Sequence, residues 1–384
     1  MERLEMYFTE IRKVLFSKDF LERHRIGEKS FIRPGSKLGF TKFMLFNIYL
    51  ISKSLNVALH DFFGKELGAN TPTKQAFSLT RKKLKPEAFK ELNDTFIQLH
   101  YNDNSKLKLF KDKYLLFAVD GSLVQLPKYR AISKHFGEWK NQSDIGMPMG
   151  RASVLYDVLN HQVIDAQLAP NEVAEDTLYK LHKKKEEELI LSCNNPRIYL
   201  MDRKYISLDK LIEFQERSEF YVMRIRKSWV NEFRAFAAGD EDDAVLKIQI
   251  KNRKNIGKWV NDFEHVPDYI NVRVVKIRLN TGEISYLATN LDFDIHELGM
   301  LYYLRWGVET YYNYLKSKFQ LEDFSGKMVV SVLQDFFCKV FVANLAEVCI
   351  TEAENIKSRK QNSTIATSTD AVNEAEDTEK KSTK

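Results

Sequence analysis

With 384 residues, the chain is long enough to bury a large core and to form two or three domains. Its 44% hydrophobic and 12% aromatic residues describe a globular protein, and 59 basic against 53 acidic residues give a net charge of +6. This moderate basic excess favours a polyanionic partner. The three cysteines, Cys193, Cys338 and Cys349, show no Cys-x-x-Cys spacing. This disfavours a disulfide framework or a zinc site and indicates a reducing compartment.

Two stretches bear on location. The first residues, MERLEMYFTEIRKVLF, lack the charged-then-apolar pattern of a signal peptide. The most apolar window, FMLFNIYLI at 43–51, is about half the length needed to span a bilayer. We therefore expect a soluble, cytoplasmic protein without a membrane partner.

Residues 1–110 are predicted to be all-helical. After the break GKELGANTP, Thr73 can cap a helix that carries the cations Lys74, Arg81, Lys82 and Lys83. A helix, a short turn with glycine and a basic helix are compatible with a helix-turn-helix unit that binds DNA. The alternative is a helical hairpin whose outer face is basic only because it is solvated.

The pattern changes at about residue 111. YLLFAVDGS at 114–122 and PRIYLMDRKY at 196–205 each read as a buried strand that ends in an acid, Asp120 and Asp202. Between them lie two expected strands at 151–159 and 161–169, and a helix at 171–191 with Asn171 as a possible cap. A helix at 207–218 and a strand at 219–226 follow. The predicted order is β, β, β, α, β, α, β.

The third part of the chain begins with an expected antiparallel insertion at about 228–291. Its segments LKIQIKN, INVRVVKIRLN and EISYLATNL alternate at period two around the turn NTGE. Helices are predicted at 302–319 and 331–350. From 351 to 384 the sequence contains no aromatic residue and is rich in Ser, Thr, Lys and Glu, which predicts a disordered polar tail.

The helix at 302–319, YYLRWGVETYYNYLKSKF, carries an unusual polar stripe. At 100° per residue, Tyr302, Arg305, Glu309 and Lys316 fall within about 60° of one another. The interpretation that requires no binding function is a solvated helix face with ion pairs between neighbouring turns. Tyrosine and arginine in the stripe favour phosphate contact instead.

Three acids then stand at positions that favour a common site. The carboxyl ends of neighbouring central strands meet at one sheet edge, and a helix packed across that edge can bring Glu309 to Asp120 and Asp202. Singly, Asp120 could be a turn residue, and Asp202 a helix-entry acid or a partner of Arg203. Together, three carboxylates require a compensating cation, and hard oxygen ligands suit Mg²⁺ or Mn²⁺. Two such ions support in-line phosphoryl displacement, which predicts a nuclease or strand-transfer site.

The spacing Y-(2)-R-(3)-E-(6)-K, at Tyr302, Arg305, Glu309 and Lys316, resembles the signature of the bacterial insertion-sequence type 4 transposases. VDGS and MDRKY resemble the motifs around their first and second aspartates. TKQAFSLTRKKL resembles their N-terminal DNA-binding region, and FQLEDFSGK with QDFFCKVFVANL resembles the stretch after their glutamate. The likeness covers roughly residues 40–350.

This resemblance implies an α/β fold with a ribonuclease H-like catalytic core at 111–350, interrupted by the β insertion. It implies a nucleoid-associated transposase that cuts at the terminal inverted repeats of its element and joins a 3′-hydroxyl to target DNA. Asp120, Asp202 and Glu309 would be catalytic and hold two Mg²⁺ or Mn²⁺ ions, and Tyr302, Arg305 and Lys316 would contact double-stranded DNA. A homodimer on DNA is expected.

Two departures from the family pattern concern the second motif and the C-terminus. Lys204 stands where the family usually has glycine, which puts the turn after Asp202 in question. The polar tail from 351 stands where family members usually continue with basic helices, which puts autonomous transposition in question. Two alternatives therefore stay open: a ribonuclease H-like nuclease without strand transfer, and a catalytically decayed DNA-binding protein.

Overall fold

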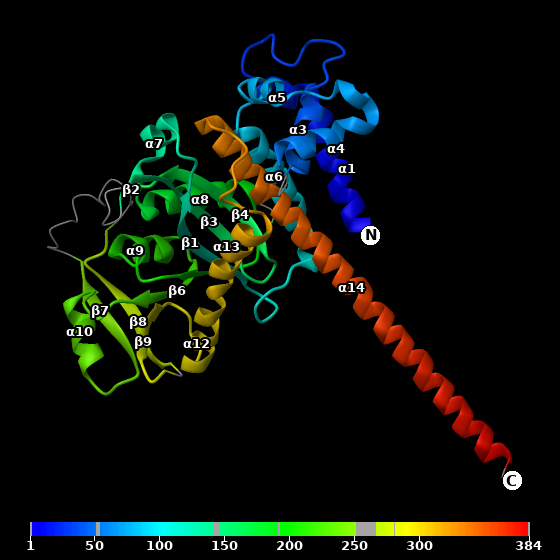
Figure 1. Cartoon of the computed structure of the whole chain (residues 1–384). Coiled ribbons are helices and arrows are strands. Elements are labelled where there is room, and N and C mark those ends of the chain that lie inside the picture. Colours follow the sequence, from blue (N-terminus) through cyan, green and yellow to red (C-terminus); the bar gives the residue numbers. More distant parts are fainter. Residues whose placement is uncertain are drawn as a thin grey trace.

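The computed structural model describes residues 2–50, 54–140, 146–190, 193–250, 266–279 and 281–382, and side chains are described up to Lys357 (Figure 1). The described part of residues 1–110 is helical. Its α-helices are α1 (Glu2–Phe16), α2 (Lys18–His24), α3 (Phe40–Tyr49), α4 (Leu55–Leu67), α5 (Lys74–Arg81) and α6 (Glu87–Tyr101). Thr73 caps α5 as predicted, since its side chain accepts a hydrogen bond from the Ala76 amide at 3.1 Å.

The described strands form one nine-stranded sheet with the order β2-β3-β1-β5-β6-β9-β8-β7, and β4 also pairs with β3. The strands β1, β5 and β6 are parallel, whereas β3 runs antiparallel to β1 and β4 antiparallel to β3. The bounds are β1 (Leu115–Gln125), β2 (Glu138–Lys140), β3 (Gly146–Asp157), β4 (Gln162–Pro170), β5 (Arg197–Met201), β6 (Phe220–Ile225), β7 (Asp243–Gln249), β8 (Tyr269–Arg278) and β9 (Ile284–Thr289).

Helices cover both faces of the sheet (Figure 1). On β3, Ser153 contacts His182 of α8, whereas Tyr156 faces Gly307 of α13, as does Val158 just after the strand. Alternate residues of a strand point to opposite faces, so α8 and α13 lie on opposite sides. The helices of this part are α7 (Arg130–Phe136), α8 (Glu175–Leu189), α9 (Leu208–Glu216), α10 (Asn231–Ala238), α12 (Ile295–Leu304), α13 (Trp306–Lys318) and α14 (Val329–Ser382). Ala174, and not Asn171, is the N-cap residue of α8.

The period-two segments at 228–291 pair antiparallel, β7 with β8 and β8 with β9. Because β9 pairs antiparallel with β6, these strands continue the same sheet. The first residue of the predicted NTGE turn lies outside the described residues. The segment also contains α10, which the alternation did not predict.

The single helix predicted at 302–319 is divided at Arg305 into α12 and α13. Around this point the backbone hydrogen bonds join residues three positions apart, as in a 3₁₀-helix. Arg305 N donates to Tyr302 O and Val308 N donates to Arg305 O, both at 3.1 Å. Gly307 then lets α13 approach β3 closely, because a Cβ at this position would lie 3.2 Å from Val158 Cγ1.

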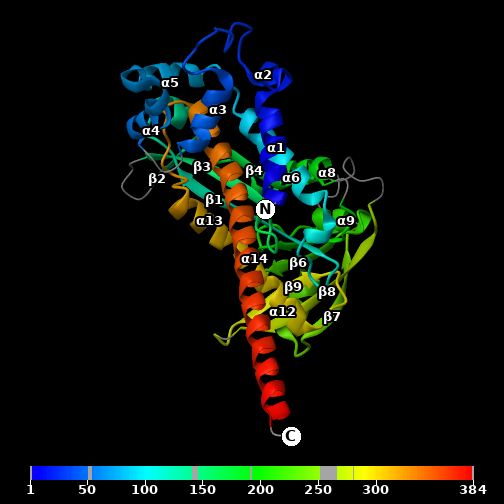
Figure 2. The same ribbon diagram turned by 90° about the vertical axis from the view of Figure 1, so that its right-hand side faces the viewer.

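The last helix differs most from prediction. The structure continues α14 to Ser382, through the segment expected to be disordered. Residues 351–382 contain neither proline nor glycine and are rich in good helix formers, so nothing in the sequence stops the helix. Figures 1 and 2 show its C-terminal half extending away from the rest of the protein.

One helix of the described part, spanning Val329–Lys357, is long and apolar enough to cross a membrane by length and composition alone. However, 67% of its most apolar window is buried inside the protein. Its apolar residues, among them Val332, Phe336, Phe341 and Ala343, are fully buried in the core. This is the pattern of a central core helix.

Candidate active site

Asp120 and Asp202 lie at the same level on neighbouring parallel strands. The pairing of β1 with β5 runs in register from Leu115–Arg197 to Val119–Met201, and each strand then continues into its aspartate. Neighbouring strands are about 5 Å apart, so the two carboxylates start from adjacent backbone positions. The expectation that Asp120 ends its strand is wrong: β1 continues to Gln125 because its pairing with β3 extends that far.

Glu309 is held by Arg305 one helical turn earlier. Arg305 Nη2 donates to Glu309 Oε1 at 2.7 Å, and the guanidinium lies 5.5 Å from the centre of the Tyr302 ring. The stripe therefore does contain an ion pair between neighbouring turns, as the interpretation as a solvated helix face predicts. Yet Arg305 is only 5% exposed, so this part of the stripe is not a solvated face.

Two side chains of α13 fasten this helix to β1 at Asp120 and at the residues that follow it. The Tyr312 hydroxyl donates to the Asp120 carbonyl oxygen at 3.1 Å. Lys316 Nζ donates to Ser122 Oγ and to the Leu123 carbonyl oxygen, both at 3.3 Å. The stripe of α13 is thus seated against the strand that carries Asp120.

Burial raises the pKa of Asp120 to about 6. The Gly121 amide, which donates to Asp120 Oδ1 at 2.9 Å, and the Arg305 guanidinium act in the opposite direction. The negative charges of Glu309 and Glu175 raise the pKa further. The carboxyl group of Asp120 therefore lies where the protein itself does not fully compensate a negative charge.

The donor set fits a hard divalent cation in its chemistry. Asp202 is half-buried and makes no side-chain hydrogen bond or ion pair with any described residue. Carboxylate oxygens are the ligands that Mg²⁺ and Mn²⁺ prefer. Within the described residues, no three His, Cys, Asp or Glu side chains are already grouped to hold a metal ion. Glu309 is instead engaged by Arg305.

A fourth acid, Glu175 in the first turn of α8, lies beside Asp120 and was not predicted. Its Oε1 accepts from Arg151 Nη1 at 2.9 Å and from Lys204 Nζ at 3.3 Å. No sequence signal singles it out, because acids are common in the first turn of any helix. Lys204, at the position where the resemblance leads us to expect glycine, has no positive φ, so the turn after Asp202 accepts its side chain without backbone strain.

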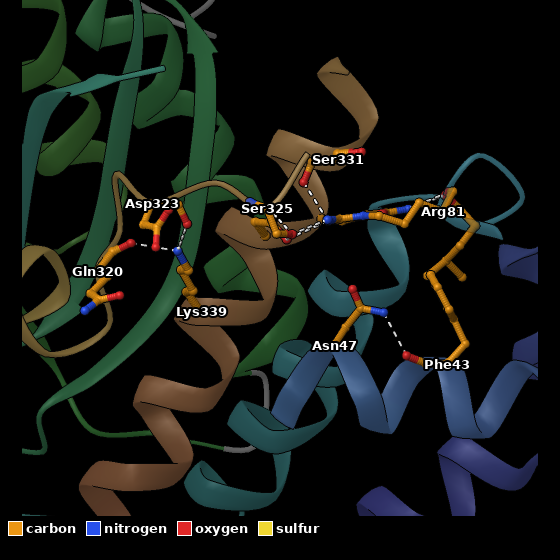
Figure 3. Close-up of polar contacts among 11 residues, drawn as sticks. Phe43, Asn47, Arg81, Gln320, Asp323, Ser325, Ser331 and Lys339 are labelled. Carbon is orange, nitrogen blue, oxygen red and sulfur yellow. Dashed lines mark hydrogen bonds and ion pairs between the residues drawn. The ribbon is translucent and has the colours of Figure 1, made fainter. Parts of the chain in front are cut away.

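The basic residues of the N-terminal region separate into two groups. Lys74, Lys82 and Lys83 are exposed, and α5 ends before the last two. Arg81 is only 1% exposed, and its guanidinium donates to Gln334 Oε1, Ser325 Oγ, the Ser331 carbonyl oxygen and Asp335 Oδ1. Figure 3 shows this side chain reaching from the N-terminal helices to Ser325 and Ser331. The expectation that Arg81 contacts DNA does not agree with this placement.

The chain is similar to known transposases in its sequence family and in its fold. Residues 111–345 match the family described as "Transposase DDE domain", which is more than half of the chain. A search of curated proteins found no match. Among solved structures, the chain is similar to the piggyBac transposase in a synaptic complex with hairpin DNA, with 12% identity and a TM-score of 0.51. The similarity covers 92% of this chain and 76% of the piggyBac chain, and at this identity it shows the fold alone.

Proposed function

Because the chain belongs to the transposase DDE domain family, we propose that it cuts DNA at the terminal inverted repeats of an insertion sequence and joins the freed ends to target DNA. Asp120, Asp202 and Glu309 are the proposed catalytic residues. The subfamily we propose is the bacterial insertion-sequence type 4 group, on the spacing of Tyr302, Arg305, Glu309 and Lys316. A cytoplasmic, nucleoid-associated location follows from this function.

The observation that carries the proposal is the shared register of Asp120 and Asp202 beneath α13. Sites in open α/β sheets lie at the carboxyl ends of central parallel strands, and each aspartate follows directly after the last residue of the parallel pairing between β1 and β5. Two observations support the same position for α13, the helix that carries Glu309. Tyr312 contacts the Asp120 backbone, and the charge of Glu309 raises the pKa of Asp120.

A ribonuclease H-like core is supported by the pairing within the sheet. The strands β4, β3 and β1 follow one another antiparallel, and β1, β5 and β6 are parallel neighbours. Helices α8 and α9 connect β4 to β5 and β5 to β6. This is the β, β, β, α, β, α, β order that the family resemblance implies, with α7 and the short strand β2 inserted between β1 and β3, and with β7 to β9 added beyond β6.

Asp120, Asp202 and Glu309 are the residues that would hold two Mg²⁺ or Mn²⁺ ions, which activate a water or hydroxyl and stabilise the leaving oxygen of a phosphodiester. Asp120 has to be ionised for this role. Its pKa is raised to about 6, and a bound cation would favour the ionised form. To serve as a ligand, Glu309 would have to release its bond to Arg305. The planar guanidinium of Arg305 would then be available to a phosphate.

DNA contacts are proposed for six side chains of the predicted set. Lys74, Lys82 and Lys83 are exposed and can reach phosphates of an element end. Tyr302, Arg305 and Lys316 lie around the proposed metal site, and Lys316 retains 33% of its side-chain exposure. Double-stranded DNA as a partner, at element ends and at the target, is further supported by the DNA complex of the piggyBac transposase. A homodimer on DNA is part of the proposal.

The test uses labelled duplexes that carry the inverted repeats flanking the gene, incubated with the protein and Mg²⁺. Joined products support transposition. Cleaved but unjoined products support a nuclease without strand transfer, and bound but uncut DNA a decayed DNA-binding protein. Asp202→Asn is the matched control: it keeps the shape of the site and should abolish cutting, and a variant that cuts at the native rate would contradict the assignment.

A further inference from the structure

The segment after β1 presents an unpaired basic surface. Lys128, Arg130 and Lys134, on α7 and just before it, are exposed. Lys327, from the loop before α14, places its Nζ 5.1 Å from the centre of the Tyr129 ring and so joins this group. We name these four cations, with Tyr129, the α7 ridge.

None of the four cations forms an ion pair within the part of the chain that the structure describes. Cations elsewhere on the surface are commonly paired, as in Arg23–Glu91, Lys185–Asp94 and Arg273–Asp243. Cations that lie close together without ion-pair partners repel one another and attract polyanions. An exposed aromatic ring among them is typical of surfaces that contact nucleic acid.

The ridge is held in a fixed position relative to Asp120. From Asp120 to Gln125, β1 extends about 17 Å at about 3.4 Å per residue, and α7 starts five residues later. Glu322 accepts from the Gln125 amide at 3.0 Å, and Lys316 binds the Leu123 carbonyl oxygen, so α13 and the loop after it fasten this part of β1.

The loop that carries Lys327 is also fastened at three residues before Lys327. Lys339 Nζ donates to the carbonyl oxygens of Gln320 and Asp323 at 2.7 and 2.6 Å, and Arg81 Nη1 donates to Ser325 Oγ at 2.5 Å (Figure 3). Helix α7 itself packs beside the start of α14 (Figure 1). The ridge therefore lies on segments that are fastened to β1, to α14 and, through Arg81, to the N-terminal helices.

We propose that the α7 ridge binds the phosphate backbone of duplex DNA on one side of the proposed cutting site. At about 3.4 Å per base pair, the ridge meets phosphates roughly 5 to 8 base pairs from the bond that is cut. This distance rests on the proposed function, because it takes Asp120 as the cutting site. The proposal that the ridge binds duplex DNA does not depend on that function.

The experiment compares two quadruple alanine variants of the full chain on a labelled duplex of arbitrary sequence. The ridge variant replaces Lys128, Arg130, Lys134 and Lys327. The control variant replaces four exposed cations that lie away from the ridge and also form no ion pair with a described residue: Lys108, Lys113, Lys184 and Lys357. Both lose the same charge. We expect the slope of log K against log salt to become shallower by about 2 to 4 in the ridge variant. The control variant should change it by much less.

A third variant guards against misfolding: Lys128→Arg, Lys134→Arg and Lys327→Arg together keep every charge and should keep the native slope. An unchanged slope in the alanine ridge variant, or an equal loss in the control variant, would overturn the proposal. The outcome is independent of chemistry. If the alanine ridge variant has a shallower salt slope but the native protein never cuts element ends, the ridge proposal holds and the proposed function is wrong. If the native protein cuts element ends but the ridge variant keeps the native slope, the proposed function holds and the ridge proposal is wrong.

Discussion

Arg81 and Asp335 form a buried ion pair, with Nη2 and Oδ1 at 2.5 Å, that joins the last residue of α5 to α14. Arg81 is separated from Asp335 by 254 positions in the sequence. Asp335 also accepts from the Ser325 amide at 2.8 Å, so one carboxylate ties together the N-terminal helices, α14 and the loop after α13. The pair connects the region proposed to bind DNA ends with α14 and, through Ser325, with the loop that follows the helix of Glu309.

Arg81→Ala should lower the free energy of unfolding by about 3 to 5 kcal/mol, because removal of one partner leaves the other charge buried and uncompensated. Lys82→Ala is the matched control: the next residue is exposed, and the change should stay within about 0.5 kcal/mol. Urea unfolding of both variants provides the comparison. Equal stabilities would mean that Arg81 is not anchored as the structure shows.

His100 should make the protein sensitive to acid. Burial, with a smaller effect of the Arg3 charge, lowers the pKa of His100 to about 3. In the unfolded chain the imidazole takes up a proton near pH 6.5, whereas the folded state resists it. Stability from this group is therefore complete above pH 6.5 and is lost as the pH falls from 6.5 towards 3.

His100→Gln should accordingly flatten the loss of stability between pH 7 and pH 4, measured as the shift of the urea midpoint. His60→Gln serves as the control, since the side chain of His60 is 81% exposed and has a similar environment in both states. If native protein and His100→Gln lost stability in parallel over this range, another group would have to be responsible.

The central strands and their acids could be predicted from the sequence because their signal is local. The apolar runs before Asp120 and Asp202 are long enough to define buried strands, and parallel pairing then brings the two acids together. The period-two alternation after Ile225 likewise predicted antiparallel pairing. In each case the information lies within about ten residues.

The burial of Arg81 could not be predicted in this way. The segment TRKKL, which contains Arg81, shows only a run of basic residues. Arg81 is the cation that is buried because it bonds to Gln334 and Asp335, which lie far along the chain. The bond between Glu175 and Lys204 has the same origin, since it joins a helix start to a loop across the sheet. Contacts between distant segments carry no local periodicity.

The end of α14 can be tested by truncation. Ile356 is half-buried, and the charge of Glu352 acts on Tyr7 of α1, so the helix still contacts the body there. Beyond Lys357 it extends away from the protein (Figure 2). Truncation after Lys357 should leave the Tm unchanged, whereas truncation after Ile350 should lower it measurably. A fall in Tm on removing only 358–384 would show that this segment packs on the body.

The roles within the α13 stripe can be separated by two substitutions. Glu309→Gln keeps the shape of the side chain but removes a charge from the proposed metal site, so cleavage should fall by orders of magnitude. Binding to element ends should survive or tighten slightly, because a negative charge near phosphate is gone. Lys316→Ala should instead weaken the complex and leave some metal-dependent cutting at high protein concentration.

The two variants have different structural consequences, which the measurement has to separate. Lys316 also holds α13 to Ser122 and Leu123, so its removal loosens the seat of the helix on β1. Lys316→Arg keeps the charge and the reach and should restore binding if the phosphate contact is what matters. Gel-shift titration and single-turnover cleavage of the same labelled ends give binding and chemistry separately. Cutting by Glu309→Gln at near the native rate would return the stripe of Tyr302, Arg305, Glu309 and Lys316 to a purely structural role, with the Arg305–Glu309 ion pair as its function.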